Sequence, residues 1–247
     1  FETTVLYQHP HEPSMPVAVV AIRETSLPDA TLSTLFPAIR RRHTNRSAFT
    51  GDALAPDAVA AICDVLDAYP RTLRALLHQH QEALAALVTE ADRELMSRSA
   101  VRAELAHHLR KRDGQQGDGI CTDTIGINAP LGVASWVMRN MNLGLVQAER
   151  DRERLEKSAV TVMVTADDDQ VSLIQAGEIL ERLLLTITLH GLQYTFINQP
   201  VEVPSIRNQL QSLALTAPPP QLMISIGAAS ENSRPAPRRP VEEVVIR

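Results

Sequence analysis

The sequence predicts an α+β fold in which a mixed β-sheet packs against helices. Three segments support this prediction. Residues 159–166, AVTVMVTA, alternate valine with threonine and methionine, as a buried strand does. Residues 172–190 repeat apolar side chains at helical spacing. Residues 71–112 have a long helical pattern, and such a block between strand–helix units is not the order of a doubly wound sheet.

The N-terminal third begins with two apolar runs, VLYQ and VAVVAI, on either side of the proline-bearing segment HPHEPSMP. The second run fits either a buried strand or a short helix. Asp29 and Thr31 precede an apolar-periodic stretch, which predicts a short helix that leads into a group of arginines. Pro56 or Asp57 then begins another helix, and Pro70 ends it.

The middle of the chain combines helical and irregular patterns. Residues 71–112 carry leucines at helical spacing with a break near Ser97, so we expect two helices there. The glycine-rich segment DGQQGDG at 113–119 predicts a loop. Residues 119–157 join an apolar stretch to the charged run ERDRERLEK. We interpret residues 119–157 as a helix-containing lid that leaves the core, with the charged run facing solvent.

The helix at 172–190 should present an apolar stripe and end at Gly191. The stripe is formed by Leu173, Ala176, Leu180, Leu183 and Ile187. Gly177 inside this helix should cost about 1 kcal/mol relative to alanine. We therefore expect another part of the protein to approach the helix closely at Gly177.

Strand patterns return after this helix, in YTFINQ and in LMISIGAA, and the short helix SIRNQLQSL lies between them. Residues 232–247 read as an extended, proline-punctuated tail. We find no long internal repeat, so residues 1–247 are expected to form a single domain.

Composition excludes several classes of protein. The net charge is −5 and 44% of the residues are hydrophobic, so we expect a globular protein that does not bind nucleic acid. There is no apolar run of the roughly 20 residues that a membrane span needs, and two cysteines cannot form a disulfide framework. We expect a cytoplasmic location. Because the chain begins at Phe1 without a methionine, we also expect it to derive from a longer product.

Common cofactor and metal motifs are missing from the sequence. There is no GxGxxG, no P-loop, no HExxH and no GxSxG. His107 and His108 are adjacent and would point to different faces of a helix, so no metal site is expected.

The arginine cluster IRRRHTNRSAF, residues 39–49, stands out in an acidic chain. Arg42, His43, Thr44 and Arg46 are close enough to surround one anionic group, and the planar guanidinium suits phosphate. Read alone, these residues fit better a basic helix end favoured by the negative helix C-terminus. Two further arginines stand between prolines in PRRPVEEVV, where either a binding segment or a solvent-facing tail fits.

Taken together, these segments resemble the nitroreductase family of flavoproteins over residues 36–247. RRHTNRSAF resembles the basic segment that opens the family's core, residues 160–210 resemble the later strand, "GE" helix and flavin-facing loop, and PRRPVEEVV is similar to the basic C-terminal segment. RRRHTNR, DGI, QPVEVP and RRPVEEVV look most like the Acg-type branch. The resemblance implies a nitroreductase-like fold.

The resemblance also implies an FMN site, residue by residue. The cofactor-binding positions are Arg42, His43, Thr44, Arg46, Asn198, Gln199, Arg238 and Arg239. The first four match the segment that holds the phosphate, ribityl chain and ring edge of FMN. Asn198 and Gln199 lie in the loop that faces flavin N5 and O4, and the last two match the phosphate-binding tail. The resemblance implies no catalytic side chain, because the flavin carries the chemistry.

The implied function is an FMN-dependent oxidoreductase that passes electrons from NAD(P)H through the flavin to a nitroaromatic, a quinone or a similar small acceptor. The segment PS-x-x-N-x-Q-P-W, which nitroreductases take from the other subunit, is absent. We therefore expect either a homodimer or pairing with an N-terminal half that this chain lacks. Two alternatives remain: a lid-covered protein that binds or stores FMN without turnover, and a cofactor-free fold remnant that serves as an interaction module.

Overall fold

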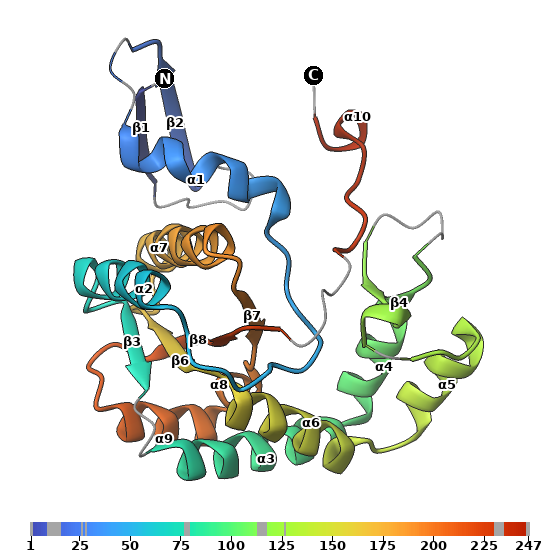
Figure 1. Cartoon of the computed structure of the whole chain (residues 1–247). Helices are drawn as coiled ribbons and strands as arrows, with labels where there is room; N and C mark the ends of the chain where they lie inside the picture. Colours follow the sequence, from blue (N-terminus) through green and yellow to red (C-terminus); the bar gives the residue numbers. More distant parts are fainter. Residues whose placement is uncertain are drawn as a thin grey trace.

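The structure is a computed structural model that describes residues 2–8, 16–25, 27, 29–76, 80–112, 118–125, 127–229 and 235–245. Its centre is a four-stranded sheet in the order β3-β6-β8-β7 (Figure 1). The strands are β3 Leu73–Leu76, β6 Val160–Thr165, β7 Gln193–Phe196 and β8 Pro220–Gly227. All three neighbouring pairs in this sheet are antiparallel. The predicted α+β class is confirmed, and β6 is a central strand as its valine alternation indicated.

Helices cover both faces of the sheet, because alternate residues of β6 and β8 point to opposite sides. Val162 and Ile224 belong to a cluster with α2 (Pro56–Ala68) and α7 (Gln170–Leu189). Met163 and Met223 belong to a second cluster with α3 (Gln81–Ser97), α9 (Pro204–Ala214) and the end of α6 (Gly144–Lys157). Figure 1 shows α2 and α7 on one side of the sheet and α3, α6 and α9 on the other. The core is therefore a three-layer sandwich.

The long helix α7 confirms the helix predicted at 172–190. Asp169 caps its N-terminus by accepting a hydrogen bond from the Ser172 backbone N–H, and Gly191 ends it with a φ of 71°. The expected close contact at Gly177 is wrong. A Cβ atom built at Gly177 would meet nothing within 4 Å, so no neighbouring group within the described chain requires glycine there.

Residues 71–112 are only partly helical, which corrects the prediction for their beginning. Residues 73–76 form β3, which pairs antiparallel with β6. A strand this short has too few residues to show alternation, and its place is set by the edge of β6, which needs hydrogen-bond partners. Residues 77–79 lie outside the described residues. The predicted break into two helices is confirmed by α3 (Gln81–Ser97) and α4 (Ser99–His108).

The predicted lid, residues 119–157, contains two kinds of structure. Its elements are β5 (Ile120–Cys121), the 3₁₀ turn η2 (Thr122–Ile125), α5 (Leu131–Asn140) and α6 (Gly144–Lys157). β5 pairs in parallel with β4 (Leu109–Arg110). The charged run lies in α6, whose Asp151 and Leu155 are each 1% exposed. The expectation of a solvent-facing run is therefore wrong for one face of α6. The predicted loop at 113–119 lies mostly outside the described residues.

The N-terminal residues form a hairpin of β1 (Glu2–Tyr7) and β2 (Ala18–Arg23), followed by α1 (Ala30–Arg41). The second apolar run is thus a strand, and α1 confirms the short helix before the arginines. Figure 1 shows the hairpin and α1 beside α7, apart from the central sheet. No helix in the part of the chain that the structure describes is long and apolar enough to cross a membrane.

The C-terminal part adds α8 (Gln199–Glu202) and α9 (Pro204–Ala214), the latter being the predicted short helix. The tail at 232–247 is less extended than predicted. Residues 235–240 have no regular structure, but Val241–Val244 form the single turn α10. Pro240 immediately before this turn suits a helix start, because its fixed φ is compatible with the first turn.

Candidate functional site

A cavity of about 560 Å³ lies between the end of α3, α4, α5, the start of α6 and α8. Its walls are mostly apolar. Side chains that line it include Leu95, Leu105, Val133, Met138 and Val146 from these helices and Ile120 from β5. This volume is in the range of small-molecule and cofactor sites, which are usually apolar with a few polar groups at one end.

The polar end of the cavity is formed by residues from four separate segments. They are Arg46, Asp92, Arg154, Asn198, Gln199 and Glu202. Three of them, Arg46, Asn198 and Gln199, are among the predicted FMN-binding residues. The structure therefore brings one residue of the arginine cluster, Arg46, and the loop after β7 to the same cavity.

Asp151 does not line the cavity itself, but it accepts hydrogen bonds from side chains that do. Its Oδ1 accepts a hydrogen bond from Arg154 Nη1 at 2.6 Å, and its Oδ2 accepts from Gln147 Nε2 and Gln199 Nε2, each at 2.6 Å. Asp151 thus has a guanidinium and two amides as donors, so both of its carboxyl oxygens are hydrogen-bonded. Arg154 Nη2 also donates to the backbone carbonyl of Arg46 at 2.7 Å and fixes that segment to α6.

Asp92 faces the cavity from α3 without comparable support. It is 1% exposed, and its Oδ2 is buried and has no hydrogen-bond partner. Burial and then the charge of Asp151 raise the pKa of Asp92 to about 8, although Gln199 and Arg154 act in the opposite direction. Burial also raises the pKa of Glu202, with the charge of Glu104 adding to the effect.

Arg46 is half-buried at the cavity wall. Burial lowers the pKa of Arg46, the like charge of Arg154 lowers it further, and Asp151 partly compensates. Two guanidinium groups therefore share the carboxylate of Asp151. The positive charge at this wall is therefore only partly compensated. An anion or an electron-rich oxygen in the cavity would compensate it further.

Arg42 lies away from the cavity, against α7 and β7. Its Nη1 donates a hydrogen bond to the Tyr194 hydroxyl at 2.9 Å, and its Nε lies 2.8 Å from Glu181 Oε1. Thr44 hydrogen-bonds to the same tyrosine hydroxyl. His43 Nδ1 lies 2.9 Å from the backbone carbonyl of Arg41. The structure therefore separates these three predicted residues from the cavity wall.

The tail brings one predicted arginine to Arg42 and places the other elsewhere. Arg238 Nη2 donates to the backbone carbonyl of Arg42 at 3.2 Å, so the two basic segments are in contact. Arg239 Nε instead lies 3.0 Å from Asp118 Oδ1, in the segment before β5. Arg110 and Arg112 hold the tail by donating to the backbone carbonyls of Pro237 and Pro235.

Sequence reasoning missed Asp92, Asp151 and Arg154. A signal for the first two exists in the chain. Asp92 lies four residues after Val88 and three before Leu95, and Asp151 lies four before Leu155, so both carboxyl groups are on the apolar faces of their helices. Ionisable residues on such faces need an explanation, because an unpaired buried charge is costly. Arg154 follows as the partner of Asp151.

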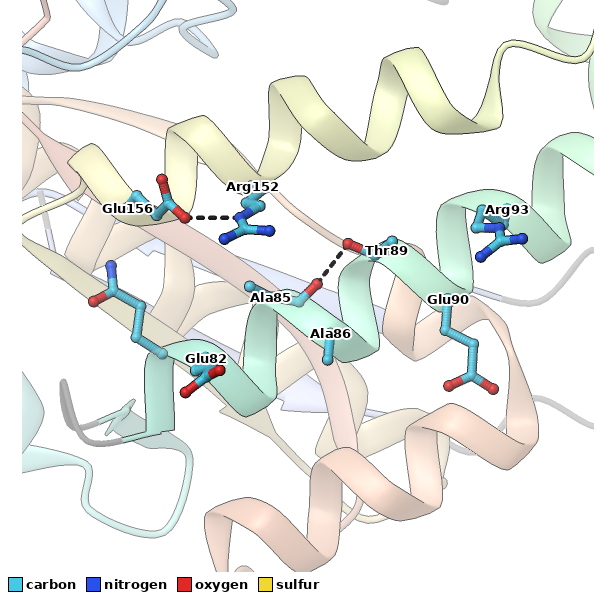
Figure 2. Close-up of a pocket in the computed structure, with 9 residues that line it drawn as sticks. Glu82, Ala85, Ala86, Thr89, Glu90, Arg93, Arg152 and Glu156 are labelled. Carbon is cyan, nitrogen blue, oxygen red and sulfur yellow. Dashed lines mark hydrogen bonds and ion pairs between the residues drawn. The ribbon is translucent and has the colours of Figure 1, made fainter.

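A second hollow, of about 760 Å³, lies on the outer side of α3 and α6 and differs in character (Figure 2). Its walls are largely charged or polar. Arg152 Nε pairs with Glu156 Oε1 at 2.8 Å, and the Thr89 hydroxyl donates to the backbone carbonyl of Ala85 at 2.8 Å. It contains none of the predicted binding residues. Within the described residues, no group of three His, Cys, Asp or Glu side chains could hold a metal ion.

Comparison with known sequences gives partial matches. No family model matches the chain. Over 92 residues it is 33% identical to "Putative NAD(P)H nitroreductase acg" of Mycobacterium tuberculosis strain H37Rv, a match that covers 36% of this chain and 28% of that protein. Over 88 residues it is 31% identical to "Putative NAD(P)H nitroreductase Rv3131" of the same strain, covering 35% and 26%. The matched segment therefore spans between about a quarter and three tenths of these curated relatives.

Comparison with solved structures shows the fold. The chain is similar to the FMN-dependent nitroreductase NfnB of Mycobacterium smegmatis in complex with NADPH, with a TM-score of 0.53 and 14% identity over 87% of this chain and 98% of that one. It is also similar to a mutant of the FMN and NADPH-dependent nitroreductase NfnB of Sphigopyxis sp. strain HMH, with a TM-score of 0.50 and 15% identity over 86% and 97%.

Proposed function

We propose that this chain, which has the nitroreductase-like fold and is distantly homologous over part of its length to Acg-type proteins, is an FMN-dependent oxidoreductase. It would pass electrons from NAD(P)H through the flavin to a nitroaromatic, a quinone or a similar small acceptor. One observation carries the proposal. The apolar cavity ends at Arg46, Asn198 and Gln199, which come from two segments that the family resemblance assigns to FMN.

The residues at the cavity fit the ring of FMN. Apolar walls suit a planar conjugated ring, and the polar end offers complementary groups. Gln199 Oε1 is buried without a hydrogen-bond partner and can accept from a ring N–H. The Arg46 guanidinium lines the same wall and can donate to a ring oxygen.

The arginines predicted to bind the phosphate of FMN form the phosphate end of the site. Two of them are paired with carboxylates here, and these pairs can be exchanged for a phosphate. Arg42 and Arg238 are in contact, and Arg42 is paired with a Glu181 side chain that is 43% exposed. Arg239 is paired with an Asp118 side chain that is 72% exposed. Exposed ion pairs contribute roughly 0–1 kcal/mol, so a phosphate can replace these carboxylates at small cost.

Bound FMN would supply the redox chemistry, and the protein would supply binding, orientation and electrostatics. The apolar walls from α4 and α5 exclude water from the ring. The guanidinium groups of Arg46 and Arg154 place positive charge at the end where the ring oxygens would lie. Positive charge at this position favours a reduced, anionic ring over the oxidised one.

A lid-covered FMN-binding protein without turnover is the second proposal, and one observation favours it. Val133, Val137 and Met138 of α5 form part of the cavity wall, so this helix would cover a bound ring. The α6 half of the predicted lid is packed into the core through Leu155. We propose that only residues 119–143 act as a lid.

The test begins with the colour of the purified chain and its titration with FMN. Saturable binding with a change in flavin absorbance is expected, and a chain that stays colourless in excess FMN would overturn both flavin proposals in favour of a cofactor-free module. The yellow protein is then mixed with NADPH without oxygen. Rapid bleaching supports the oxidoreductase, whereas colour that persists supports the storage protein.

The exposed apolar side chains of the hairpin and α1 support a further proposal, that a second copy of this chain covers them. Leu6 and Val19, which are opposite each other in the hairpin and so share a face, are 61% and 41% exposed, and Phe36 of α1 is 73% exposed. A two-stranded hairpin is marginally stable alone, and clustered exposed apolar side chains usually mark an interface. We therefore propose a homodimer in which β1, β2 and α1 form the contact.

A further inference from the structure

Two buried carboxyl groups lie at the polar end of the cavity, and the protein satisfies both oxygens of only one of them. Asp151 accepts hydrogen bonds from Arg154, Gln147 and Gln199. Asp92 lines the cavity itself, and its Oδ2 is buried without a partner. An ionised carboxylate with an unsatisfied buried oxygen is costly, whereas a protonated one can serve as a donor. The unsatisfied oxygen therefore favours a proton on Asp92.

The charged groups that face Asp92 do not all act in the same direction, since the carboxyl groups favour its protonation and the positive charge of Arg154 opposes it. They are Asp151 and Arg154 from α6, Glu202 from α8, and Arg46 from the segment after α1. Burial and then the negative charge of Asp151 raise the pKa of Asp92 to about 8. Near neutral pH most molecules therefore carry a proton at Asp92.

We propose that Asp92 is a neutral carboxylic acid that donates a hydrogen bond to a ring carbonyl of the molecule bound in this cavity. The inference rests on the proposed function, because it takes the cavity as the site of the cofactor or the acceptor. It adds a hydrogen-bond donor from α3, a helix that carries none of the binding residues predicted from the sequence.

The chemistry of the ligand follows from two neighbouring groups. Asp92 offers an O–H donor, and Gln199 offers Oε1, a buried acceptor without a partner. A planar ring with a carbonyl next to an N–H would satisfy both, and the pyrimidine part of a flavin ring has this pair. A quinone has the carbonyl alone and would satisfy only Asp92. The shared feature is the ring carbonyl, so both ring types are tested.

There is also an arrangement that needs no ligand. The Asp92 O–H could donate to Gln199 Oε1 within the protein, because Gln199 hydrogen-bonds to both carboxyl groups through its amide. In that arrangement the protonation of Asp92 would not affect ligand affinity. The pH dependence of binding separates the two arrangements.

The experiment measures the dissociation constants of riboflavin and menadione at pH 6 and pH 9 for the wild-type chain and for Asp92→Asn. Riboflavin has the flavin ring without the phosphate, so the arginines at the phosphate end do not contribute. Wild-type affinity for the ligand that occupies the cavity should fall about tenfold between the two pH values, because about a tenth of Asp92 stays protonated one pH unit above its pKa. Asp92→Asn keeps a neutral donor and should bind with no such fall.

Glu202→Gln is the matched control, since Glu202 is a second carboxyl group at the same cavity with a raised pKa. It should keep the pH dependence of the wild type. If Glu202→Gln removes the dependence and Asp92→Asn keeps it, the assignment to Asp92 is overturned. A dependence seen with riboflavin identifies the flavin ring as the ligand, and one seen with menadione alone identifies the acceptor.

A measurement on the wild-type chain protects the test against a variant that fails to fold. Infrared spectra of the chain with isotopically labelled aspartate should show the carbonyl band of a protonated carboxyl group at pH 6 and lose it by about pH 9.5, well above the pKa. Absence of this band at pH 6 overturns the inference, as does affinity for both ligands that does not change with pH.

FMN binding without any pH-dependent ring binding overturns the inference but leaves the proposed function. Menadione binding that depends on Asp92, without FMN binding, supports the inference but overturns the proposed function.

Discussion

Arg42 and Glu181 form an ion pair in which Arg42 Nε lies 2.8 Å from Glu181 Oε1, while the same guanidinium donates to the Tyr194 hydroxyl. Arg42 is also the residue whose backbone carbonyl Arg238 contacts. If this region binds the phosphate of FMN, Glu181 competes with that phosphate for Arg42. The pair therefore gives a direct test of the phosphate end of the site.

Glu181→Gln should strengthen FMN binding by up to about fivefold, because an exposed ion pair contributes roughly 0.2–1 kcal/mol. Riboflavin binding should not change, since riboflavin has no phosphate. Titration of both flavins into wild type and variant by fluorescence quenching checks this. Asp167→Asn, which breaks a similar exposed pair with Arg71, is the control and should change neither affinity. Equal effects of Glu181→Gln on both flavins would place the phosphate elsewhere.

Arg46→Ala should weaken both FMN and riboflavin. Arg46 lines the ring cavity and not the phosphate end, and a hydrogen bond from a charged group contributes about 1.5–3 kcal/mol, which corresponds to a loss of roughly 10- to 150-fold. Isothermal titration calorimetry measures the change. Arg40→Ala, an exposed arginine of the same cluster, should leave both affinities unchanged. A loss confined to FMN would mean that Arg46 binds the phosphate.

The sequence predicted the parts of the fold that depend on local pattern. The alternation in β6 and the period of α7 are set by burial on one or both faces, so they are visible in the chain itself. β3 could not be recognised in this way. It is a four-residue edge strand that forms because β6 has backbone groups to pair, and that is a tertiary effect.

The site was predictable to a similar extent. Arg46, Asn198 and Gln199 could be matched to a family pattern, and the structure places them on one cavity wall. The role of Asp92 depends on α6 packing against α3, which places Asp151 beside it. A single sequence does not show which helices are neighbours, so only the presence of a carboxyl group on an apolar face could be noticed.

Gly177→Ala should increase the free energy of unfolding by about 1 kcal/mol, because glycine inside a helix costs about this much relative to alanine and the added methyl group meets no atom within 4 Å. Urea denaturation followed by circular dichroism measures the change. Gly119→Ala is the contrasting variant and should destabilise the protein. Gly119 has a φ of 112°, and an added Cβ would clash with the His108 carbonyl oxygen. If Gly177→Ala destabilises, a partner chain approaches α7 at this position.

Phe36→Glu should convert a dimer of this chain into a monomer, because it places a charge where the proposed contact is apolar. Phe36 lies on α1 and is 73% exposed. Sedimentation velocity over a range of protein concentrations gives the oligomeric state. Leu215→Glu is the matched control. Leu215 is 83% exposed beyond α9 and should leave the state unchanged. A wild-type chain that is monomeric at high concentration would contradict the proposed interface.

Asp92→Asn should stabilise the protein increasingly as the pH rises. The pKa of Asp92 in the folded chain is about 8 and its ordinary value is 3.8, so folding takes up a proton between these values. The stability that the protonated carboxyl group provides is fully present below about pH 4 and is lost as the pH rises towards 8. Asparagine stays neutral and does not show this loss.

The free energy of unfolding of Asp92→Asn relative to wild type should therefore increase between pH 5 and pH 8 by on the order of 1 kcal/mol per pH unit and then level off. Urea denaturation at each pH measures the difference. Asp168→Asn gives the opposite sign, because hydrogen bonds from Arg207 and Gln221 lower the pKa of Asp168, and its loss of stability should be constant over this range. A constant difference between Asp92→Asn and wild type from pH 5 to pH 8 would mean that Asp92 is ionised in the folded protein. The donors at the polar end of the cavity would then have to be assigned differently.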